Sequence, residues 1–454
     1  MSIILIGAGD IGYHVARRLS LEKKDVTIID KDIDKIKKVQ DALDVQTSLG
    51  SGSSLKVLQT AGIADADMII AVTDSDEVNM ISCLVANAQT KIPTKVARVR
   101  NLEYLYNPEI LRKSNLSIDL MINPDFEAVS SIIKLLQVPG ATDVVDFNEG
   151  RVKLIGYKVQ NTLFYEGLKL EDLRQKSHID DMVIASIYRD GEVLIPRGKD
   201  KIFYNDFIYA ITTDKNIHRM LNFFGRDYKE VRKIIIVGGG NIGVLLAKEL
   251  EKMKISTKLI DSDEVRCKRI TDELDKTLVL HHGGEVEEIL SEEYIEDTDM
   301  FIAVTDDEED NILLSLLAKQ KGAGKSVALI HNMTYTQLVS NIGIDLVINP
   351  NLCAINRILH FIRKGKILSV ASFYEKNAEA IEAVALETSD LVNRPINRLK
   401  FPKDAIIGAI LRDNQLIVPK GDSIISPGDH VIIFALTSVI PRVEKMLMVK
   451  IDYW

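Results

Sequence analysis

The chain has 454 residues, of which 46% are hydrophobic and 27% charged, and it carries a net charge of −9 with a pI near 5.5. The length and composition are typical of a globular protein with two to four domains. The negative charge argues against nucleic-acid binding, because contact with a phosphate backbone requires a clustered basic face and no such cluster stands out in the sequence. Three widely separated cysteines favour a reducing compartment over a disulfide framework, and no apolar run approaches the roughly 20 residues that span a bilayer, so any membrane role must come through a partner.

The first predicted element is a buried strand over residues 3–6, followed directly by a GxGxxG pattern that opens a helix. This context of strand, loop and helix is the one that a dinucleotide-binding loop requires. Gly7 permits the tight turn, Gly9 lets a pyrophosphate approach the backbone, and Gly12 lets helix and strand pack closely. The helix N-terminus adds unpaired N–H groups and a positive dipole end for phosphates. The alternative is a Rossmann-like fold that keeps such a loop without a ligand.

The second predicted strand, residues 26–29, ends at Asp30, which lies 18 positions after Gly12. A carboxylate at this place accepts hydrogen bonds from ribose hydroxyls and repels a 2′-phosphate. Asp30 therefore favours NAD or an adenine nucleotide over NADP. The alternative is that Asp30 only caps the next helix.

Two later strands end in residues suited to a ligand site. Thr73 and Asp74 follow the apolar strand at 68–72, beside the point where doubly wound sheets bind ligands. Thr73 either bonds a ribose or phosphate or caps the following helix. Arg98 ends another apolar strand, and it is either a phosphate ligand or a structural arginine paired with an acid.

From about residue 145 the pattern changes to strands joined by tight turns. The Asp190-Gly191 pair predicts a hairpin, and Asn205-Asp206 predicts a turn before a strand at 207–211. The polar stretch 225–230 is predicted to link two halves of the chain. Alternating strands and helices before residue 135 predict a parallel sheet with crossover helices.

The second half repeats the first. An offset of 231 residues carries Gly7 onto Gly238 and Asp30 onto Asp261. An offset of 232 residues carries the Ala-Val-Thr-Asp segment at 71–74 onto the one at 303–306. The second glycine loop is predicted to repeat the geometry of the first.

The repeat extends to the β-rich region but not to every site residue. The segment 412–415 is its predicted turn, and Leu329 stands where the first half has Arg98. The two sites are therefore predicted not to be equivalent. The fold class is α/β: two Rossmann-like parallel-sheet domains, each followed by a small α+β, β-rich C-terminal domain. The predicted domains are 1–135 and 231–362 for nucleotide binding, and 141–225 and 368–454 for the small domains.

The order of these domains and several of their motifs resemble the TrkA family, the peripheral subunits of Trk potassium uptake systems built from RCK/KTN domains. The motifs are the two glycine loops, the Gly-Ser-Gly-Ser-Ser segment at 50–54, the Ala-Val-Thr-Asp segments, Arg98 and the Asn-Pro pairs at 123–124 and 349–350. The resemblance covers essentially the whole chain. It implies a protein that catalyses nothing, binds NAD(H) and ATP or ADP, and assembles as a homo-oligomeric ring. It also implies a cytoplasmic protein, peripheral on the inner face of the cell membrane, that gates a membrane-embedded, TrkH-like potassium translocator.

The resemblance also implies the site residues. Those of the first site are Gly7, Ala8, Gly9, Asp10, Ile11, Gly12, Asp30, Ser53, Ser54, Thr73 and Arg98, and those of the second are Gly238, Gly239, Gly240, Asn241, Ile242, Gly243 and Asp261. Two departures stand out: the family usually carries an Asp or His where Ser51 stands, and the second-half loop at 282–285 lacks the serine pair and adds a carboxylate. A carboxylate near phosphates should weaken anion binding.

Two rival functions remain. An NAD-dependent oxidoreductase would need a proton donor or metal ligands beside the nicotinamide, yet the histidines lack metal-ligand spacing and the β-rich domains show no catalytic cluster. A pure assembly scaffold with vestigial sites is the other. We expect a regulator in which nucleotides bind two ring conformations unequally, with Arg98, Arg100 or a residue across a subunit contact sensing the γ-phosphate.

Overall fold

The computed structural model describes the chain apart from Lys91, Pro139, Asn414 and the segments 108–116, 226–230, 283–294, 333–334, 336–338, 340–341, 363–366, 374–377 and 448–454. The predicted linker at 225–230, the predicted turn at 412–415 and the loop at 282–285 therefore lie partly outside the described residues. Among the described helices, none combines the length and apolar character needed to cross a membrane.

The first half opens with a parallel sheet in the strand order β3-β2-β1-β4-β5-β6. Its central strands β1 and β4 are buried on both faces, which explains their continuous apolar runs. The bounds are β1 (Ser2–Ile6), β2 (Asp25–Asp30), β3 (Gln46–Leu49), β4 (Met68–Ala71), β5 (Thr94–Arg98) and β6 (Leu120–Ile122). The chain reverses its direction of winding between β1 and β4, so the first glycine loop lies at a topological switch point.

Helices cover both faces of this sheet. The helices of this part of the chain are α1 (Asp10–Leu21), α2 (Ile33–Ala42), α3 (Leu55–Thr60), α4 (Asp76–Thr90), α5 (Leu102–Tyr106) and α6 (Pro124–Gln137). Of these, α6 does not cover the first sheet, because its apolar face packs against the second one.

The second half repeats the arrangement in the order β16-β15-β14-β17-β18-β19. The strands are β14 (Lys233–Val237), β15 (Ser256–Asp261), β16 (Leu278–His281), β17 (Met300–Ala303), β18 (Lys325–Leu329) and β19 (Leu346–Ile348). The helices of this half include α9 (Asn241–Lys252), α10 (Glu264–Glu273), α12 (Glu308–Gln320) and α14 (Pro350–Ile362). The predicted pair of Rossmann-like sheets is confirmed.

Each half continues into a small antiparallel sheet, in the order β11-β10-β13-β8-β7 in the first half and β23-β22-β24-β21-β20 in the second. The first contains β7 (Asp143–Phe147), β8 (Val152–Lys158), β10 (Val183–Arg189), β11 (Glu192–Leu194) and β13 (Phe207–Thr213), with the two-stranded pair β9 (Leu168–Lys169) and β12 (Lys201–Ile202) and the helices α7 (Leu170–Ser177) and α8 (Ile217–Phe224). The second contains β20 (Ile367–Phe373), β21 (Ala378–Val384), β22 (Ala405–Arg412), β23 (Gln415–Ile417), β24 (His430–Leu436) and α15 (Ile440–Leu447). The predicted hairpin is confirmed, because Asp190 and Gly191 join β10 to β11 with positive φ angles of 52° and 86°.

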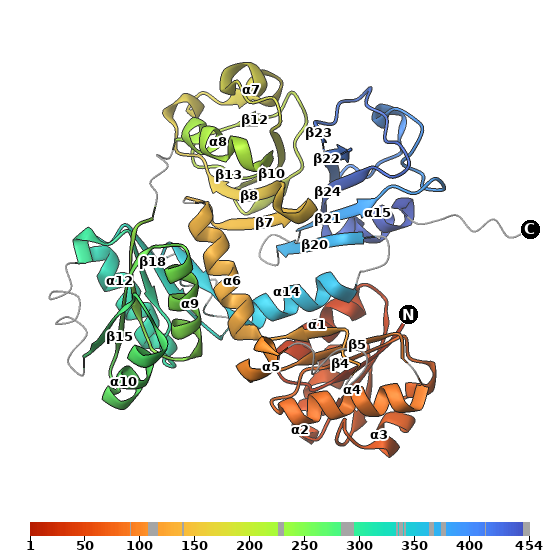
Figure 1. Ribbon diagram of the computed structural model, residues 1–454. Helices are drawn as coiled ribbons and strands as arrows, with labels where there is room; N and C mark the ends of the chain where they lie inside the picture. Colours follow the sequence, from red (N-terminus) through yellow and green to blue (C-terminus); the bar gives the residue numbers. More distant parts are fainter. Residues whose placement is uncertain are drawn as a thin grey trace, which may run out of the picture.

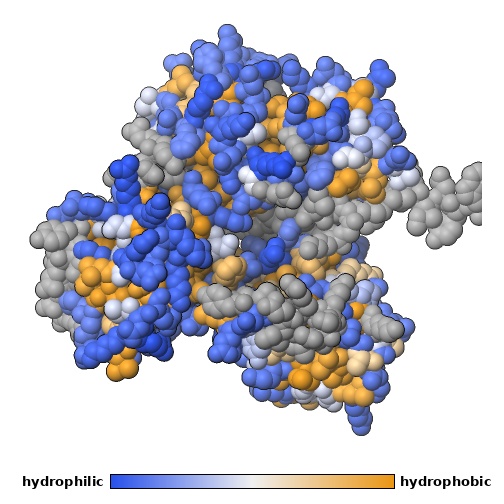
Figure 2. Space-filling view, viewed as in Figure 1, coloured by the Kyte–Doolittle hydropathy of each residue, from blue (hydrophilic) through white to orange (hydrophobic). Residues whose placement is uncertain are grey.

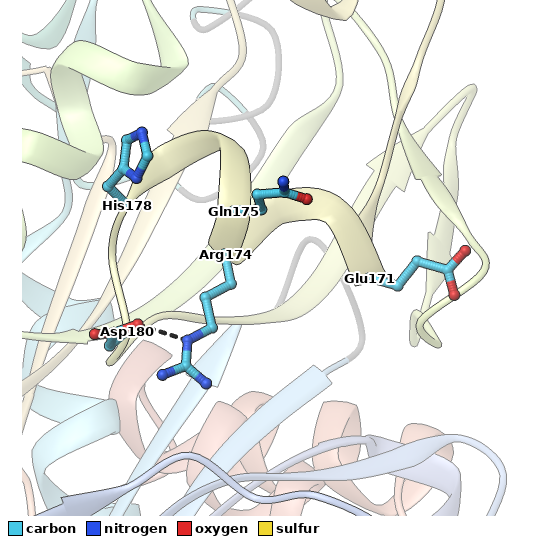
Figure 3. A pocket seen from close by; sticks show the side chains of 5 residues that line it. All are labelled: Glu171, Arg174, Gln175, His178 and Asp180. Carbon is cyan, nitrogen blue, oxygen red and sulfur yellow. Dashed lines mark hydrogen bonds and ion pairs between the residues drawn. The ribbon is translucent and has the colours of Figure 1, made fainter.

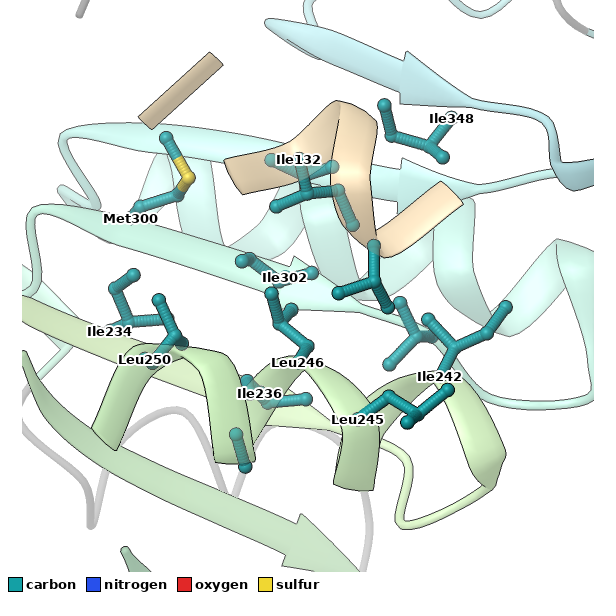
Figure 4. Packing of buried hydrophobic residues seen from close by; sticks show 14 of the residues in the cluster. Ile132, Ile234, Ile236, Ile242, Leu245, Leu246, Leu250, Met300, Ile302 and Ile348 are labelled. Atoms are coloured by element: carbon teal, nitrogen blue, oxygen red, sulfur yellow. The ribbon is translucent and has the colours of Figure 1, made fainter. Parts of the chain in front are cut away.

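The two halves exchange their last Rossmann helices. The apolar face of α6, including Ile132 and Leu136, packs into the core of the second sheet beside Ile236 and Leu246, as Figure 4 shows for Ile132. Conversely, α14 packs its apolar face against the first sheet and α1. The helices α6 and α14 also contact each other between the two Rossmann-like domains (Figure 1). The division into domains by residue number remains a prediction, but each nucleotide-binding core is completed by a helix from the other half.

The small domains also pack against each other. The faces of their sheets form one shared apolar cluster in which the ring of Tyr209 lies 4.4 Å from that of Phe373 and 5.6 Å from that of Phe434. In Figure 1 the two small domains lie side by side on one side of the crossing helices. Hydrophilic residues cover most of the face shown in Figure 2, with apolar residues in smaller groups.

A buried ion pair ties the second small domain to the first nucleotide-binding domain. Arg18 of α1 pairs with Glu379 of β21, and its Nε lies 3.1 Å from Oε1 of Glu22. The side chain of Glu379 is fully buried. At the equivalent position of the first small domain, Lys153 pairs instead with Asp146 of the adjacent strand, at 2.6 Å.

Candidate nucleotide-binding sites

The glycines of the first loop differ in the space around them. A Cβ on Gly12 would lie 1.8 Å from the carbonyl oxygen of Gly7, so helix α1 packs directly on the turn. Gly7 has a φ of 103°, and a Cβ there would lie 3.0 Å from the backbone nitrogen of Thr73. A Cβ on Gly9, in contrast, would meet no described atom within 4 Å. Gly7 and Gly12 are therefore needed for packing, whereas the space at Gly9 is open, as a cradle for a phosphate group requires.

Gly9 also begins helix α1, and no side chain among the described residues caps that helix end. The first N–H groups of the helix, contributed by Asp10, Ile11 and Gly12, have no carbonyl of a preceding turn to bond. Together with the helix dipole they favour an anion at this point. The loop thus fits a nucleotide phosphate by both its shape and its electrostatics.

Asp30 is tied to the glycine loop rather than to the next helix. Its Oδ2 accepts a hydrogen bond from the N–H of Ala8 at 2.6 Å, and its Oδ1 accepts one from the N–H of Asp32 at 2.9 Å. Asp32 itself caps α2, through bonds from the N–H groups of Asp34 and Lys35. Since one carboxylate oxygen accepts two hydrogen bonds with ease, Asp30 retains acceptor capacity for ribose hydroxyls.

The serine-containing loop lies against the ends of the same strands. The N–H of Gly50 donates to the carbonyl of Asp30 at 2.8 Å, and a Cβ on Gly52 would lie 2.1 Å from the side chain of Ile6. The hydroxyl of Ser53 bonds that of Ser51 at 2.9 Å. Ser54 begins α3, and its hydroxyl makes no capping bond to a described residue. The structure therefore brings Ser53 and Ser54 to the edge of the sheet that carries Asp30.

Asn79 of α4 holds the next loop by all the hydrogen bonds that its amide can make. Its Oδ1 accepts bonds from the N–H and the hydroxyl of Thr73, at 2.9 and 2.7 Å. Its Nδ2 donates to the carbonyls of Thr73 and Arg98, at 3.0 and 2.9 Å. The Thr73 hydroxyl is thus engaged within the protein, where it orders the start of α4. Its proposed contact with a nucleotide remains a prediction.

Arg98 is buried, with 5% of its surface exposed, and lies beside Thr73. Its Nη1 lies 3.1 Å from Asp74 Oδ1 and 3.4 Å from the carbonyl of Thr73, while its Nε has no hydrogen-bond partner among the described residues. Burial, with the nearby charge of Arg100, lowers the pKa of Arg98 despite the opposing effect of Asp74. A buried cation with an unused donor fits an anionic ligand better than a purely structural ion pair.

The second loop repeats this geometry. Gly238 has a φ of 112°, a Cβ on Gly243 would lie 1.9 Å from the carbonyl of Gly238, and a Cβ on Gly240 would meet no described atom within 4 Å. Asn241 begins α9 at this loop, and its side-chain nitrogen lies 3.4 Å from an oxygen of Asp125, at the start of α6. Ile242 is buried in the core below the loop.

The second site departs from the first in two ways. Leu329 fills the position of Arg98, and Asp261, which accepts a bond from the N–H of Gly239 at 2.6 Å, also pairs with Arg266 at 3.1 Å. The predicted non-equivalence of the two halves thus extends to residues that the sequence analysis did not single out.

Sequence reasoning also missed the positioning residues. Asn311 repeats the four bonds of Asn79, with Thr305 and the carbonyl of Leu329 as partners. Asp76 accepts bonds from the N–H groups of Arg100 and Asn101 at 2.9 Å, which fixes the chain beyond β5. The recurrence of Asn79 as Asn311 was the available signal, because an amide kept in both copies points to a shared backbone contact.

Other candidate sites are weak. A depression along α7 is lined by Glu171, Arg174, Gln175, His178 and Asp180. The only interaction between these residues that Figure 3 marks is the surface hydrogen bond from Arg174 Nε to Asp180 Oδ1, at 2.5 Å. No group of three His, Cys, Asp or Glu side chains in the described part of the chain could hold a metal ion.

The sequence matches known families over most of its length. The model of the TrkA-N domain matches residues 3–124 and 234–350, and that of the TrkA-C domain matches residues 380–448. A Trk system potassium uptake protein TrkA from Halomonas elongata is 37% identical over 458 residues, which cover 100% of both chains. One from Azorhizobium caulinodans is 38% identical over 459 residues, with the same coverage.

Solved structures share the fold at lower identity. A GsuK channel bound to NAD aligns over 98% of this chain and 78% of its own, with a TM-score of 0.59 and 17% identity. Another GsuK channel structure aligns over 96% of this chain and 77% of its own, with a TM-score of 0.60 and 18% identity. Both alignments therefore span the two halves of this chain.

Proposed function

The chain belongs to the TrkA family of Trk potassium uptake proteins, and on that premise we propose that it is a nucleotide-binding regulatory subunit of a potassium uptake system rather than an enzyme. The observation that carries the proposal is the open space at Gly9 and Gly240, each at the start of a helix without a side-chain cap. A nucleotide bound there supplies phosphates to the backbone N–H groups of the loop. Asp30 is proposed to accept the ribose hydroxyls, and Ser53, Ser54, Thr73 and Arg98 to complete the first site.

The proposed ligands are NAD(H) and ATP or ADP. NAD(H) is favoured by the TrkA relationship and by a GsuK channel relative that was solved with NAD. ATP and ADP are favoured by Arg98, because a buried guanidinium distinguishes ligands by the charge of their terminal phosphate.

The proposed partner is a membrane-embedded potassium translocator of the TrkH type, under which copies of the chain form a ring on the inner face of the membrane. The family relationship supports a transport partner. Ligands that bind two conformations of such a ring with unequal affinity would shift its population, and a coupling of about 1–3 kcal/mol is typical of such control.

Replacement of Gly9 by Val tests the site. The φ of Gly9 is −70°, which valine tolerates, and the added side chain would fill the open cradle. We expect the variant to fold, and to lose most of the rise in melting temperature that a nucleotide at the first site produces in the unmodified chain. Full retention of that rise would show that the loop does not hold phosphate.

Replacement of Arg98 by Ala tests the sensor. We expect ATP and ADP to give equal potassium flux through the reconstituted complex, because the residue proposed to read the terminal phosphate is gone. Leu329 shows that the fold accepts an apolar side chain at the equivalent strand end. If ATP and ADP still produce different fluxes, the sensor lies elsewhere, with Arg100 the next candidate. Turnover of a redox substrate by the purified chain would instead favour an oxidoreductase.

A further inference from the structure

The two glycine loops differ at the place where each would meet a ribose. In the first half, Asp30 accepts bonds only from the backbone N–H groups of Ala8 and Asp32, and no side chain of a described residue bonds it. Lys35, on the helix that follows, is exposed to solvent. The carboxylate therefore faces the site with its negative charge uncompensated by a side-chain contact.

In the second half a guanidinium covers the equivalent carboxylate. Arg266 stands at the position of Lys35, and its Nη1 lies 3.1 Å from Oδ2 of Asp261. The same oxygen accepts the N–H of Gly239 at 2.6 Å, and only 4% of the Asp261 side chain is exposed. Oδ2 of Asp261 thus has both of its acceptor directions engaged.

Local structure fixes Arg266 in this place. Asp263 caps α10 and accepts a bond from the N–H of Arg266 at 3.0 Å, so the backbone of Arg266 is anchored in the first turn of the helix. Its side chain keeps 36% of its surface exposed, with Nη2 at 4.0 Å from Oδ2 of Asp263. The guanidinium therefore joins two carboxylates while presenting part of itself to solvent.

The chemistry of the two positions is opposite. A bare carboxylate accepts hydrogen bonds from ribose hydroxyls and repels a phosphate on the ribose. A guanidinium has only donors, and its planar fork matches the oxygens of a phosphate. A ribose placed at the second loop would meet Arg266 in front of Asp261.

We propose that Arg266 is a specificity-determining residue that lets the second site accept an adenine nucleotide with a phosphate on its ribose, of the NADP(H) class, which the first site rejects. This inference rests on the proposed nucleotide-binding function. It departs from the sequence-based expectation that Asp261 repeats the role of Asp30.

The test isolates each site in the full-length chain. Gly240→Val leaves the first site and Gly9→Val leaves the second, and the affinities of NAD⁺ and NADP⁺ are measured for both variants by calorimetry after folding is checked by thermal melting. If the valine variant does not fold, Gly9→Ala or Gly240→Ala replaces it. We expect the first site to prefer NAD⁺ by at least about tenfold, and the second to bind the two ligands within about threefold, since a charge-assisted bond is worth a factor of ten or more.

Arg266→Gln in the Gly9→Val background should then raise the preference of the second site for NAD⁺ to about tenfold. Lys35→Gln in the Gly240→Val background is the matched control, and it should leave the first-site ratio unchanged. Binding of NAD⁺ with rejection of NADP⁺ at the second site, or a ratio that Arg266→Gln does not move, would overturn the inference and leave the nucleotide-binding function intact. If the second site binds neither NAD⁺ nor NADP⁺, the inference is overturned as well, and the proposed function of that site then depends on ATP or ADP binding.

Discussion

At the scale of single residues, the candidate sites depend on side chains that hold the backbone in place. Asn79 and Asn311 use both ends of their amides to fasten the strand-to-helix loop to the end of the neighbouring strand. Both are buried, with 0% and 1% of their surface exposed. Neither residue needs to touch a ligand in order to set the position of Thr73 or Thr305 beside the glycine turn.

Replacement of Asn79 by Ala should therefore weaken both folding and nucleotide binding at the first site. It leaves buried groups of Thr73 and Arg98 without their partner, at a cost of about 1–3 kcal/mol in the free energy of unfolding. Asn311→Ala is the control, because it should cost similar stability without changing first-site affinity. Equal losses of first-site affinity in the two variants would mean that the effect of Asn79 is global.

The sequence predicted the glycine loops and Asp30 because the reason for each residue is local: a turn, a close approach, a strand end. It did not predict Arg266 over Asp261, since Lys35 occupies the same position in the first half and a basic residue on the first turn of a helix is ordinary. Whether such a side chain turns inward or outward depends on contacts that spacing does not reveal. The partners of Arg98 were foreseen only as an alternative.

At the scale of elements, each small domain contains the same arginine–aspartate ion pair, called the clasp below. Arg412 donates two bonds to Asp429, at 2.9 and 2.7 Å, and a third to the carbonyl of Ile424, and Arg189 makes the equivalent bonds to Asp206 and Lys201. The clasp ties the strand before the hairpin to the turn that precedes β24. Burial alone would raise the pKa of Asp429, but the hydrogen bonds and charge of Arg412 and the N–H of Ser426 outweigh it and lower the pKa.

This lowered pKa gives the second small domain a dependence on pH. A carboxyl whose folded-state pKa lies below its unfolded value of about 3.9 stabilises the fold above that pH, and the stabilisation is lost as the pH falls through the folded pKa. We expect unmodified protein to exceed Asp429→Asn in free energy of unfolding at pH 7, and the difference to shrink below about pH 4. Urea unfolding from pH 7 to pH 3 measures it, with the exposed turn variant Asp413→Asn as control. A difference independent of pH would contradict the assignment.

The exchanged helix α6 offers a second prediction at this scale. Ile132 is 2% exposed and lies in the core of the second sheet, so Ile132→Ala should cost about 2–5 kcal/mol in the free energy of unfolding. Phe126, on the same helix, is 46% exposed, and Phe126→Ala should cost clearly less. Similar costs for the two variants would mean that α6 does not depend on the second half for its burial.

Sequence patterns predicted the strands, the sheets and the duplication, since hydrophobic periodicity and turn residues are features of each element alone. They could not show that α6 packs on the second sheet and α14 on the first, because the sequence pattern of an amphipathic helix is the same whichever sheet it packs against.

At the scale of the whole molecule, the buried pair of Arg18 and Glu379 links the helix of the first glycine loop to the second small domain. Arg18→Met should destabilise the chain by about 3–5 kcal/mol, because the fully buried carboxylate loses its cationic partner. The double variant Arg18→Met/Glu379→Leu should regain much of this loss. Urea unfolding of the single and double variants gives the comparison, and a double variant as unstable as the single one would show that the pair is not coupled.

The exchange of α6 and α14 has a consequence for how the two copies could diverge. A pair of identical half-length chains that traded these helices would build much the same body, but every substitution would then appear twice, once in each copy. Joining the copies in one polypeptide removes that constraint, so that equivalent positions can carry different residues: Arg98 and Leu329, Lys35 and Arg266, Lys153 and Glu379. Covalent fusion thus lets two copies of one binding domain acquire different ligand specificities within a single fold.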